Sequence, residues 1–154
     1  MGRDGVRYGR VETLVRPMDE RDAAEVTPLC AQLGYPAMEA RIAARILRLL
    51  QHPDHRMFVA QVAAGRVAGW IHVQTTQWLV TEPFALVCGL VVDEQYRGRR
   101  IGRALMERAE EWARRRGCRE MLLYTNIRRI SAHLFYRGLG YTSDKTSHAF
   151  RKLL

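Results

Sequence analysis

The stretch that decides the fold reads Gly89-Leu90-Val91-Val92-Asp93-Glu94-Gln95-Tyr96-Arg97-Gly98-Arg99-Arg100-Ile101-Gly102-Arg103-Ala104-Leu105. Apolar residues run up to Val92 and predict a strand, and a short loop that contains glycine follows it. From Ile101 onward, apolar residues recur at the 3.6-residue spacing of an amphipathic helix, which we expect to end at Gly117. The sequence therefore predicts a strand that enters a helix through a tight, basic loop.

This loop has the properties of an anion site. The first N–H groups of a helix have no partner inside it, and the helix dipole places about half a positive charge there. Gly98 and Gly102 lack a Cβ atom, so the backbone can approach a phosphate closely. We expect a phosphate or pyrophosphate site rather than a glycine-bearing turn with a solvated basic face, although neither a Walker loop nor a G-x-G-x-x-G motif is present. Four arginines add charge at the same point: Arg97, Arg99, Arg100 and Arg103.

The periodicity on either side of this stretch predicts a mixed order of helices and strands. Upstream we expect a strand over 11–16, a helix from the N-cap Asp19 to Gly34, a second helix after Pro36, and strands over 57–62, 67–75 and 84–92. Downstream we expect a strand over 121–125, a helix over 130–137 and a last strand over 147–153. Neither a helical bundle nor a repeating βαβ fold fits this order.

Composition indicates one globular domain. The chain has 154 residues, of which 47% are hydrophobic and 27% are charged, close to the average of folded domains. Residues 1–10 are polar and rich in glycine, so we expect a flexible tail followed by a single domain over 11–154. The N-terminal residues lack the apolar run of an export signal, and the chain has no apolar stretch long enough for a membrane span.

The three cysteines predict no metal site or disulfide framework. Cys30, Cys88 and Cys118 are odd in number and lie far apart in the sequence, so we interpret them as free thiols in a reducing cytoplasm. We expect Cys88 to be a small buried residue rather than a nucleophile. His52 and His55 have a possible ligand spacing, but Pro53 prevents a regular helix across them and no third ligand is evident, so we expect no metal.

The net charge of +9 indicates an anionic partner, and nucleic acid is one hypothesis. Only Lys145 and Lys152 are lysine, so 23 of the 25 basic residues are arginine, which can also reflect a genome-wide habit. A nucleic-acid-binding module predicts arginines along one helix face with interleaved aromatic residues, and the chain does not show this pattern. Its densest arginines lie instead at one strand–helix junction, so nucleic acid is the less favoured partner.

The junction also resembles a known family. The run from Arg97 to Gly102, after Leu90-Val91-Val92, is similar to the acyl-CoA-binding signature [RQ]-x-x-G-x-[GA] of the GNAT N-acetyltransferases. Arg100 stands where the middle glycine usually lies, which leaves open whether it alters cofactor affinity. A second segment resembles the strand–helix part of the same family, and the two motifs have the expected order and spacing, so the resemblance covers nearly the whole chain. That segment reads Leu123-Tyr124-Thr125-Asn126, then Arg129, Ala132-His133, Phe135-Tyr136 and Gly140-Tyr141.

The resemblance implies a fold, a cofactor and a set of site residues. The fold would be the α/β (mixed α+β) GNAT acyl-CoA N-acyltransferase fold, with a mostly antiparallel mixed sheet of six to seven strands and helices on both faces. The strand at Leu90, Val91 and Val92 would splay from its neighbour and pair with the pantetheine arm of acetyl-CoA. The loop would hold the pyrophosphate through Arg97, Gly98, Arg99, Arg100, Ile101, Gly102 and Arg103. A second set would contact the cofactor from the other side: Asn126, Arg129, Ala132, His133, Phe135 and Tyr136.

The implied activity is transfer of the acetyl group of acetyl-CoA to a primary amine by direct attack. Tyr136 matches the general acid of the family, and its alternative is a core aromatic residue; His133 either contacts the cofactor or caps local backbone. An alkylamine with a pKa of about 10.4 costs about 4.6 kcal/mol to deprotonate at pH 7. The strand over 84–89 lacks the carboxylate that family members often use as a base, so Glu82, His72 or a water chain is the candidate. The alternative is a CoA-binding regulator without turnover.

The sequence does not identify the acceptor. We expect its pocket to be built from the segment 33–48 and the loop 75–83, where Trp78 and Leu79 line either the pocket or a dimer surface. The charge of +9 would repel a polycationic acceptor at long range. The expected partners are therefore acetyl-CoA and an amine acceptor in the cytoplasm, with no membrane, and with a homodimer left open.

Overall fold

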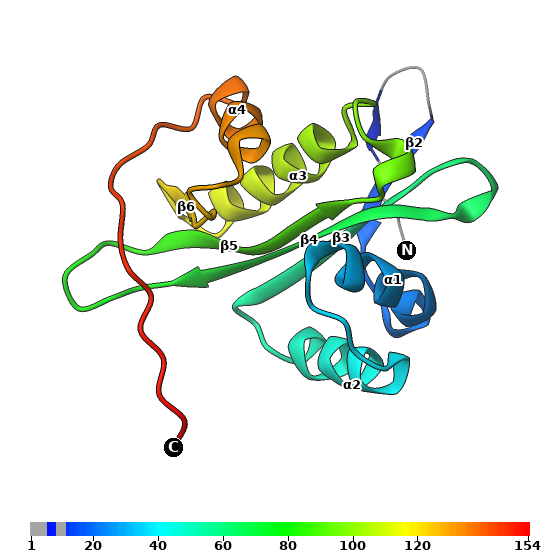
Figure 1. Cartoon of the computed structure of the whole chain (residues 1–154), viewed down its shortest axis with the longest axis horizontal. Coiled ribbons are helices and arrows are strands. Elements are labelled where there is room, and N and C mark those ends of the chain that lie inside the picture. The colour runs from blue at the N-terminus through cyan, green and yellow to red at the C-terminus, as the bar shows by residue number, and fades with distance from the viewer. Residues whose placement is uncertain (1–5, 9–11) are drawn as a thin grey trace. The chain divides into compact units, whose positions relative to one another are not determined.

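A six-stranded sheet in the order β1-β2-β3-β4-β5-β6 organises the chain up to Leu123 (Figure 1). The computed structural model describes residues 6–8 and 12–154. All neighbouring strands are antiparallel except β5 and β6, which are parallel, so the sheet is mixed and mostly antiparallel as predicted. The strands are β1 (Val6–Tyr8), β2 (Thr13–Pro17), β3 (His55–Gln61), β4 (Val67–Thr76), β5 (Phe84–Val92) and β6 (Met121–Leu123).

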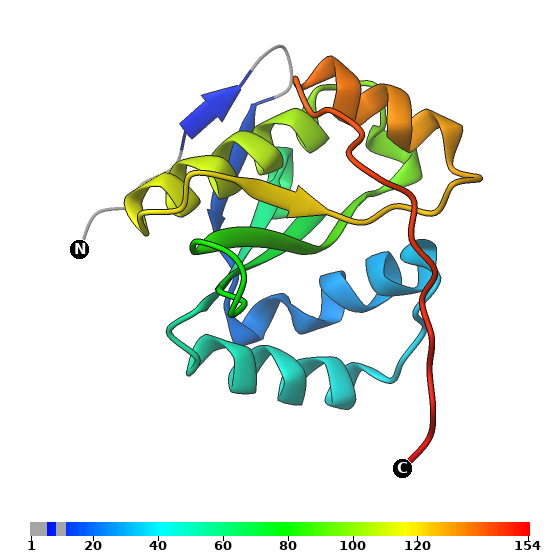
Figure 2. The same cartoon turned by 90° about the vertical axis from the view of Figure 1, so that its left-hand side faces the viewer.

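Helices cover both faces of this sheet. Helices α1 (Ala23–Leu33) and α2 (Glu39–Leu50) lie on one face, and α3 (Ile101–Arg115) lies on the other (Figures 1 and 2). Alternation along the strands supplies both cores, because successive side chains point to opposite faces. On β3, Met57 joins the cluster under α1 and α2, while the next residue, Phe58, lies under the guanidinium of Arg108 from α3 at 5.3 Å. None of the described helices is long and apolar enough to cross a membrane.

The boundaries of α1 follow from side chains that the sequence marks. Asp19 accepts a hydrogen bond from the Arg21 N–H at 2.9 Å, and its own N–H donates to the Asp22 carboxylate at 2.8 Å, in a capping box over a short 3-10 turn at Glu20–Asp22. Helix α1 follows directly, and it ends where Gly34 adopts a φ of 102° that favours glycine. The predicted end of this helix is confirmed, whereas Asp19 caps the 3-10 turn before it and the N-cap of α1 itself is Asp22.

The two ends of the chain differ from the predicted elements. Val6–Tyr8 forms strand β1, antiparallel to β2, inside the segment expected to be a tail; the rest of that segment and Val11, the predicted first residue of the next strand, lie outside the described residues. The predicted strand over 147–153 is wrong: these residues form neither helix nor strand. Only Phe150 and Leu153 are large and apolar there, and both are exposed, so the segment has too little apolar surface to hold a strand on a core.

The chain divides into two compact units, one up to Leu123 and one over 124–154. The second unit contains helix α4 (Ile130–Gly138), within one residue of its predicted end. Strand β6 is shorter than predicted and stops at Leu123, the last residue that the parallel ladder to β5 pairs.

Candidate functional site

Strand β5 has a free edge in its second half. Along one side it pairs with β4 from Phe84 to Val92, but on the other side it pairs with β6 only from Ala85 to Val87. In the part of the chain that the structure describes, no ladder continues on that side beyond Val87. The backbone N–H and C=O groups that point to this side are open to a ligand, as at any sheet edge. Leu90, Val91 and Val92, the predicted pantetheine-binding residues, lie on this edge.

The turn after β5 is held by the buried carboxylate of Asp93. Its N–H donates to the carbonyl of Ala68 at 2.8 Å, and its side chain accepts from the Gln95 N–H at 3.0 Å. The side chain thereby caps a 3-10 turn at Glu94–Tyr96. Asp93 is 6% exposed, and the Arg66 guanidinium lies 3.5 Å from it. These bonds fix the direction in which the chain leaves the sheet toward the basic loop.

The basic loop leads into a helix start that no side chain caps. Gly98 has a φ of 75° and Arg100 a φ of 63°, both in the left-handed region. Arg100 is the N-cap of α3 and makes no side-chain cap, so the N–H groups of Ile101 and Gly102 begin the helix without an acceptor in the turn before them. The family signature usually has glycine at position 100, and arginine here adopts a left-handed conformation at a cost of about 1–2 kcal/mol.

The loop arginines present their charge to solvent. The Arg99 guanidinium lies over the Tyr96 ring at 5.2 Å, and Arg97 Nε donates to the carbonyl of Val92 at 3.3 Å. No carboxylate among the described residues forms an ion pair with Arg97, Arg99 or Arg100, whereas Arg103 lies 3.8 Å from Glu107. A bare helix start, left-handed backbone and three unpaired guanidinium groups together make a site suited to phosphate oxygens.

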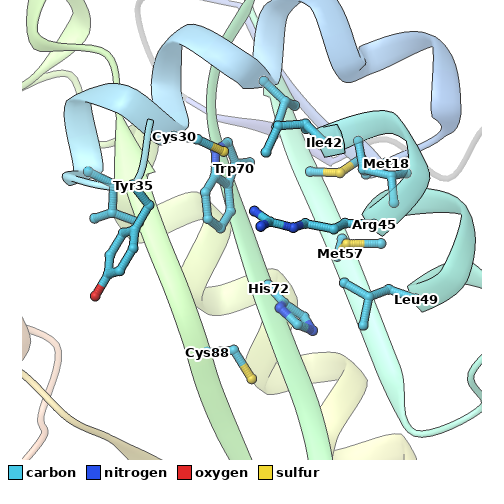
Figure 3. A pocket seen from close by; sticks show the side chains of 13 residues that line it. Met18, Cys30, Tyr35, Ile42, Arg45, Leu49, Met57, Trp70, His72 and Cys88 are labelled. Atoms are coloured by element: carbon cyan, nitrogen blue, oxygen red, sulfur yellow. The ribbon is translucent and has the colours of Figure 1, made fainter. Parts of the chain in front are cut away.

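A cavity of about 320 Å³, which we call the α1–α2 pocket, lies on the opposite face of the sheet from α3 (Figure 3). Gly89 makes room for it, because a Cβ atom there would lie 3.0 Å from the Trp70 ring that forms part of the wall. The predicted segment 33–48 contributes to the lining, but the loop 75–83 does not. The lining residues are Met18, Val26, Cys30, Leu33, Tyr35, Ile42, Arg45, Ile46, Leu49, Met57, Trp70, His72 and Cys88.

Trp78 and Leu79, expected to line either the pocket or a dimer surface, do not line the pocket. The Trp78 ring packs edge-on against Phe84 at 4.9 Å between centroids, and Leu79 is fully exposed. Both belong to the loop between β4 and β5, which does not contribute to the lining of the pocket. The homodimer left open by the sequence stays a prediction.

Cys88 lies in a β-bulge between the free edge and the pocket. The register between β4 and β5 pairs His72 with Gly89 and the next residue, Val73, with Val87, so Cys88 is the extra residue. Its side chain points toward the pocket (Figure 3). The prediction that Cys88 is buried is wrong, because the bulge turns it out of the sheet. Desolvation by the surrounding protein raises the pKa of its thiol to about 11, so the thiol is neutral at pH 7.

His72, on β4, is a titratable residue that lines the pocket. Its Nε2 lies 2.8 Å from Nδ1 of His55 on β3, and the His55 ring contacts the exposed His52 ring edge-on at 5.0 Å. Burial, and then the proximity of His55, lower the pKa of His72 to about 4. Burial also lowers the pKa of His55, with a further contribution from His52. Glu82, the other candidate base, is exposed and does not line the pocket.

This low pKa predicts a loss of stability in mild acid. The unfolded chain binds a proton at His72 near pH 6.5, whereas the folded chain does so only near pH 4, so protonation between these values favours the unfolded state. We expect the unfolding free energy to fall by up to about 3 kcal/mol over this range, reduced by solvent screening. Urea unfolding at pH 7 and pH 4.5 measures it. The variant His72→Gln should show a smaller fall than the wild type; equal falls would contradict the assigned cause.

In the second unit, α4 carries the candidate general acid. Tyr136 contacts the rings of Phe135 at 5.1 Å and Tyr141 at 6.0 Å between centroids. Burial raises the pKa of its hydroxyl, with Arg129 acting in the opposite direction. The hydroxyl is therefore protonated at neutral pH, as a proton donor requires.

The side chains of Asn126 and His133 both form hydrogen bonds with nearby backbone groups. His133 Nε2 donates to the carbonyl of Asn126 at 3.0 Å, and the Asn126 side-chain oxygen accepts from the Arg128 N–H at 2.9 Å. His133 therefore caps local backbone, and its predicted contact with the cofactor stays a prediction. Ala132 and Phe135 are partly buried on the same helix.

Metal ligation has no support in the described residues, where no group of three or more His, Cys, Asp or Glu side chains is arranged to hold an ion. The two histidines of the predicted spacing, His52 and His55, instead contact each other and continue to His72.

Comparison with known proteins identifies the family of the chain. The family described as acetyltransferase (GNAT) matches residues 23–141. An aminoglycoside N(6')-acetyltransferase type 1 of Stenotrophomonas maltophilia is 28% identical over 66% of this chain and 69% of its own length. An aminoalkylphosphonate N-acetyltransferase of Salmonella typhimurium is 34% identical over 76% of this chain and 71% of its own length.

Solved structures show the same fold. The aminoglycoside N-acetyltransferase AAC(6')-Iy in complex with CoA superposes with a TM-score of 0.83 at 20% identity, covering 96% of this chain and 98% of that one. An aminoglycoside 6'-N-acetyltransferase from Acinetobacter baumannii gives a TM-score of 0.81 at 18% identity, covering 92% and 99%.

Proposed function

Because the chain belongs to the acetyltransferase (GNAT) family, and thus uses acetyl-CoA to acetylate an amine, we propose that its acceptor is a small primary amine bound in the α1–α2 pocket. The observation that carries this proposal is the continuity of β5. The strand contributes Cys88 to the pocket wall, offers its free edge from there to Val92, and then enters the basic loop. In this proposal β5 contacts the amine through Cys88 and binds the cofactor along the rest of its free edge.

The residues at the junction fit CoA. The free edge of β5 at Leu90, Val91 and Val92 has backbone groups for an amide-containing arm, and the uncapped helix start has N–H groups for a pyrophosphate. No neighbour lies within 4 Å of a Cβ built at Gly98, so a ligand can approach the loop. When bound, acetyl-CoA supplies the acetyl thioester. The proposed pyrophosphate contacts are Arg97, Gly98, Arg99, Arg100, Ile101, Gly102 and Arg103.

A second group of proposed cofactor contacts belongs to the unit over 124–154. By their match to the family motif, Asn126, Arg129, Ala132, His133, Phe135 and Tyr136 contact the cofactor from the side of α4. Tyr136 holds its phenolic proton at neutral pH because burial raises its pKa. Its role in the proposal is to donate that proton from Oη to the departing sulfur.

His72 handles the proton of the amine in this proposal. A neutral imidazole accepts a hydrogen bond from an ammonium group, and its low pKa keeps His72 neutral throughout the physiological range. If Nε2–H of His72 donates to Nδ1 of His55, then Nδ1 of His72 is an acceptor. A proton taken up at Nδ1 is balanced by one released from Nε2 to His55, which adjoins the exposed His52. The relay avoids a lasting charge inside the pocket.

Substitution of His72 should therefore slow acetylation in a pH-dependent way. For His72→Gln we expect kcat/KM at pH 7 to fall about 100-fold, the low end of general-base effects. The deficit should shrink as the pH approaches 10, because the amine there is free without a base. A pH profile of kcat/KM for both proteins measures this. A deficit that is constant from pH 7 to 10 would show that His72 only shapes the pocket.

The experiment that tests the proposed function is an acceptor assay. Purified protein is incubated with acetyl-CoA and a set of primary amines, and the released CoA thiol and the acetylated amine are measured together. We expect equal amounts of both, dependent on the amine. Binding of acetyl-CoA without any amine-dependent thiol release would instead indicate a regulator that does not turn over. The relatives act, by name, on aminoglycosides and on aminoalkylphosphonates, so their acceptors differ in charge.

A further inference from the structure

The α1–α2 pocket carries one permanent charge, and that charge is positive. Arg45 is the single cationic lining residue among those described, and no Asp or Glu lines the cavity. Of the polar groups that remain, the imidazole of His72 is kept neutral at pH 7 by its low pKa, and burial raises the pKa of the thiols of Cys30 and Cys88. The pocket therefore attracts an anion and repels a second cation.

Arg45 has no acidic partner inside the described part of the protein. Other arginines do: Arg16 bonds Asp22 at 2.6 Å, and Arg114 bonds Glu110 at 3.1 Å. The Arg45 guanidinium instead extends over the pocket toward Trp70 (Figure 3). Burial raises the pKa of the Cys30 thiol, and the charge of Arg45 opposes this, which places that charge at the pocket wall.

The remainder of the wall is apolar and the space is small. Ile42, Ile46 and Leu49 from α2 face Met57 from β3. A volume of about 320 Å³ lies at the low end for small-molecule pockets. The cavity thus suits a compact molecule with an aliphatic or aromatic body, and it lacks the acidic side chains that several ammonium groups would need for pairing.

We propose that the acceptor is a small primary amine that carries one acidic group, a carboxylate or phosphonate, on a largely apolar body. Arg45 binds the acidic group through charge-assisted hydrogen bonds, for which its planar guanidinium is suited. The amine lies toward His72 and Cys88, next to the free edge of β5. The inference rests on the proposed function, and it distinguishes this pocket from one built for polycationic sugars.

A matched series of amines tests the acceptor class. Pentylamine, 5-aminopentanoate, 4-aminobutylphosphonate and 1,5-diaminopentane have similar lengths and differ in the group opposite the amine. We expect kcat/KM for at least one acid to exceed that for pentylamine by about 10- to 100-fold, the effect of one charge-assisted hydrogen bond. The diamine should be poorer than pentylamine. The ratio between the two acids shows which head group the site prefers.

Substitutions in α2 test whether Arg45 binds the acidic group. Arg45→Glu should remove the preference for the acids, and the diamine should become the better acceptor. Arg41→Glu is the matched control, because Arg41 is exposed on the same helix and does not line the pocket. This variant has the same change of net charge and should keep the wild-type order of kcat/KM among the four amines. Circular dichroism confirms that both variants fold.

A binding measurement tests the acceptor class independently of the proposed acetyltransferase function. Ligand-observed NMR without acetyl-CoA should detect pentanoate on the wild type and on Arg41→Glu, but not on Arg45→Glu. Turnover of amines with no preference for an acid, or pentanoate binding unaffected by Arg45→Glu, would overturn the acceptor class and leave the acetyltransferase proposal standing. Failure of every amine to release thiol, with pentanoate still bound through Arg45, would overturn only the proposed function.

Discussion

Tyr136→Phe is expected to lower kcat by about 10²–10⁴-fold, the range for loss of a general acid or base. The substitution removes one hydroxyl and keeps the ring, so the contacts with Phe135 and Tyr141 are retained. Because the hydroxyl is protonated at neutral pH, we expect its loss to remove the proton donor of the leaving sulfur, while the retained ring keeps its proposed contact with acetyl-CoA. Steady-state thiol release measures kcat, and titration calorimetry measures the dissociation constant of acetyl-CoA.

The control for this prediction is Tyr124→Phe. Tyr124 belongs to the same unit, is 61% exposed and loses the same hydroxyl. It should keep a rate close to that of the wild type. A Tyr136→Phe enzyme that is as fast as the control would make the tyrosine a packing residue, and the proton would then have to come from solvent.

Reversing charge in the basic loop should have an effect of similar size on cofactor binding. For the double substitution Arg97→Glu with Arg100→Glu we expect the dissociation constant of acetyl-CoA to rise at least about 100-fold. Two charge-assisted hydrogen bonds to phosphate are lost, each worth about 1.5–3 kcal/mol, and two carboxylates now face the anion. Both side chains are exposed, so the fold should persist. Calorimetric titration with acetyl-CoA measures the affinity.

The matched control is Arg41→Glu with Arg48→Glu on α2. It changes the net charge by the same amount at two exposed positions outside the loop. If binding weakens equally in both double variants, the effect comes from the overall charge, and the helix start of α3 is not the pyrophosphate site.

Local signals explain why much of the fold follows from the sequence. Asp19 begins the 3-10 turn that leads into α1 through a capping box, and Gly34 ends α1 as a left-handed residue; both signals depend on nearby residues only. The junction of β5 and α3 is likewise marked by an apolar run, glycines and a change of period. The prediction of a strand over 147–153 was wrong because it relied on the local strand propensity of these residues. In the structure the large apolar side chains of the segment, Phe150 and Leu153, are exposed.

The pocket depends on register and was harder to predict. The side chain of Cys88 is turned out of the sheet by a β-bulge, where the register between β4 and β5 shifts by one residue. No local sequence pattern indicates this shift. His72 meets His55 across two strands whose offset is set by tertiary pairing. Arg45 lines the pocket together with the apolar stripe of α2 that Ile42, Ile46 and Leu49 form. Its spacing of three from Ile42 and four from Leu49 places it on that stripe, so this signal was present.

The most direct test of the account is titration calorimetry of the wild-type protein with acetyl-CoA, with duplex DNA as the competing ligand. We expect one molecule of acetyl-CoA to bind per chain with a dissociation constant in the micromolar range and DNA not to displace it. Absence of acetyl-CoA binding, together with DNA binding that weakens as salt is raised, would contradict the account, because the arginines would then serve a phosphate backbone instead of a cofactor.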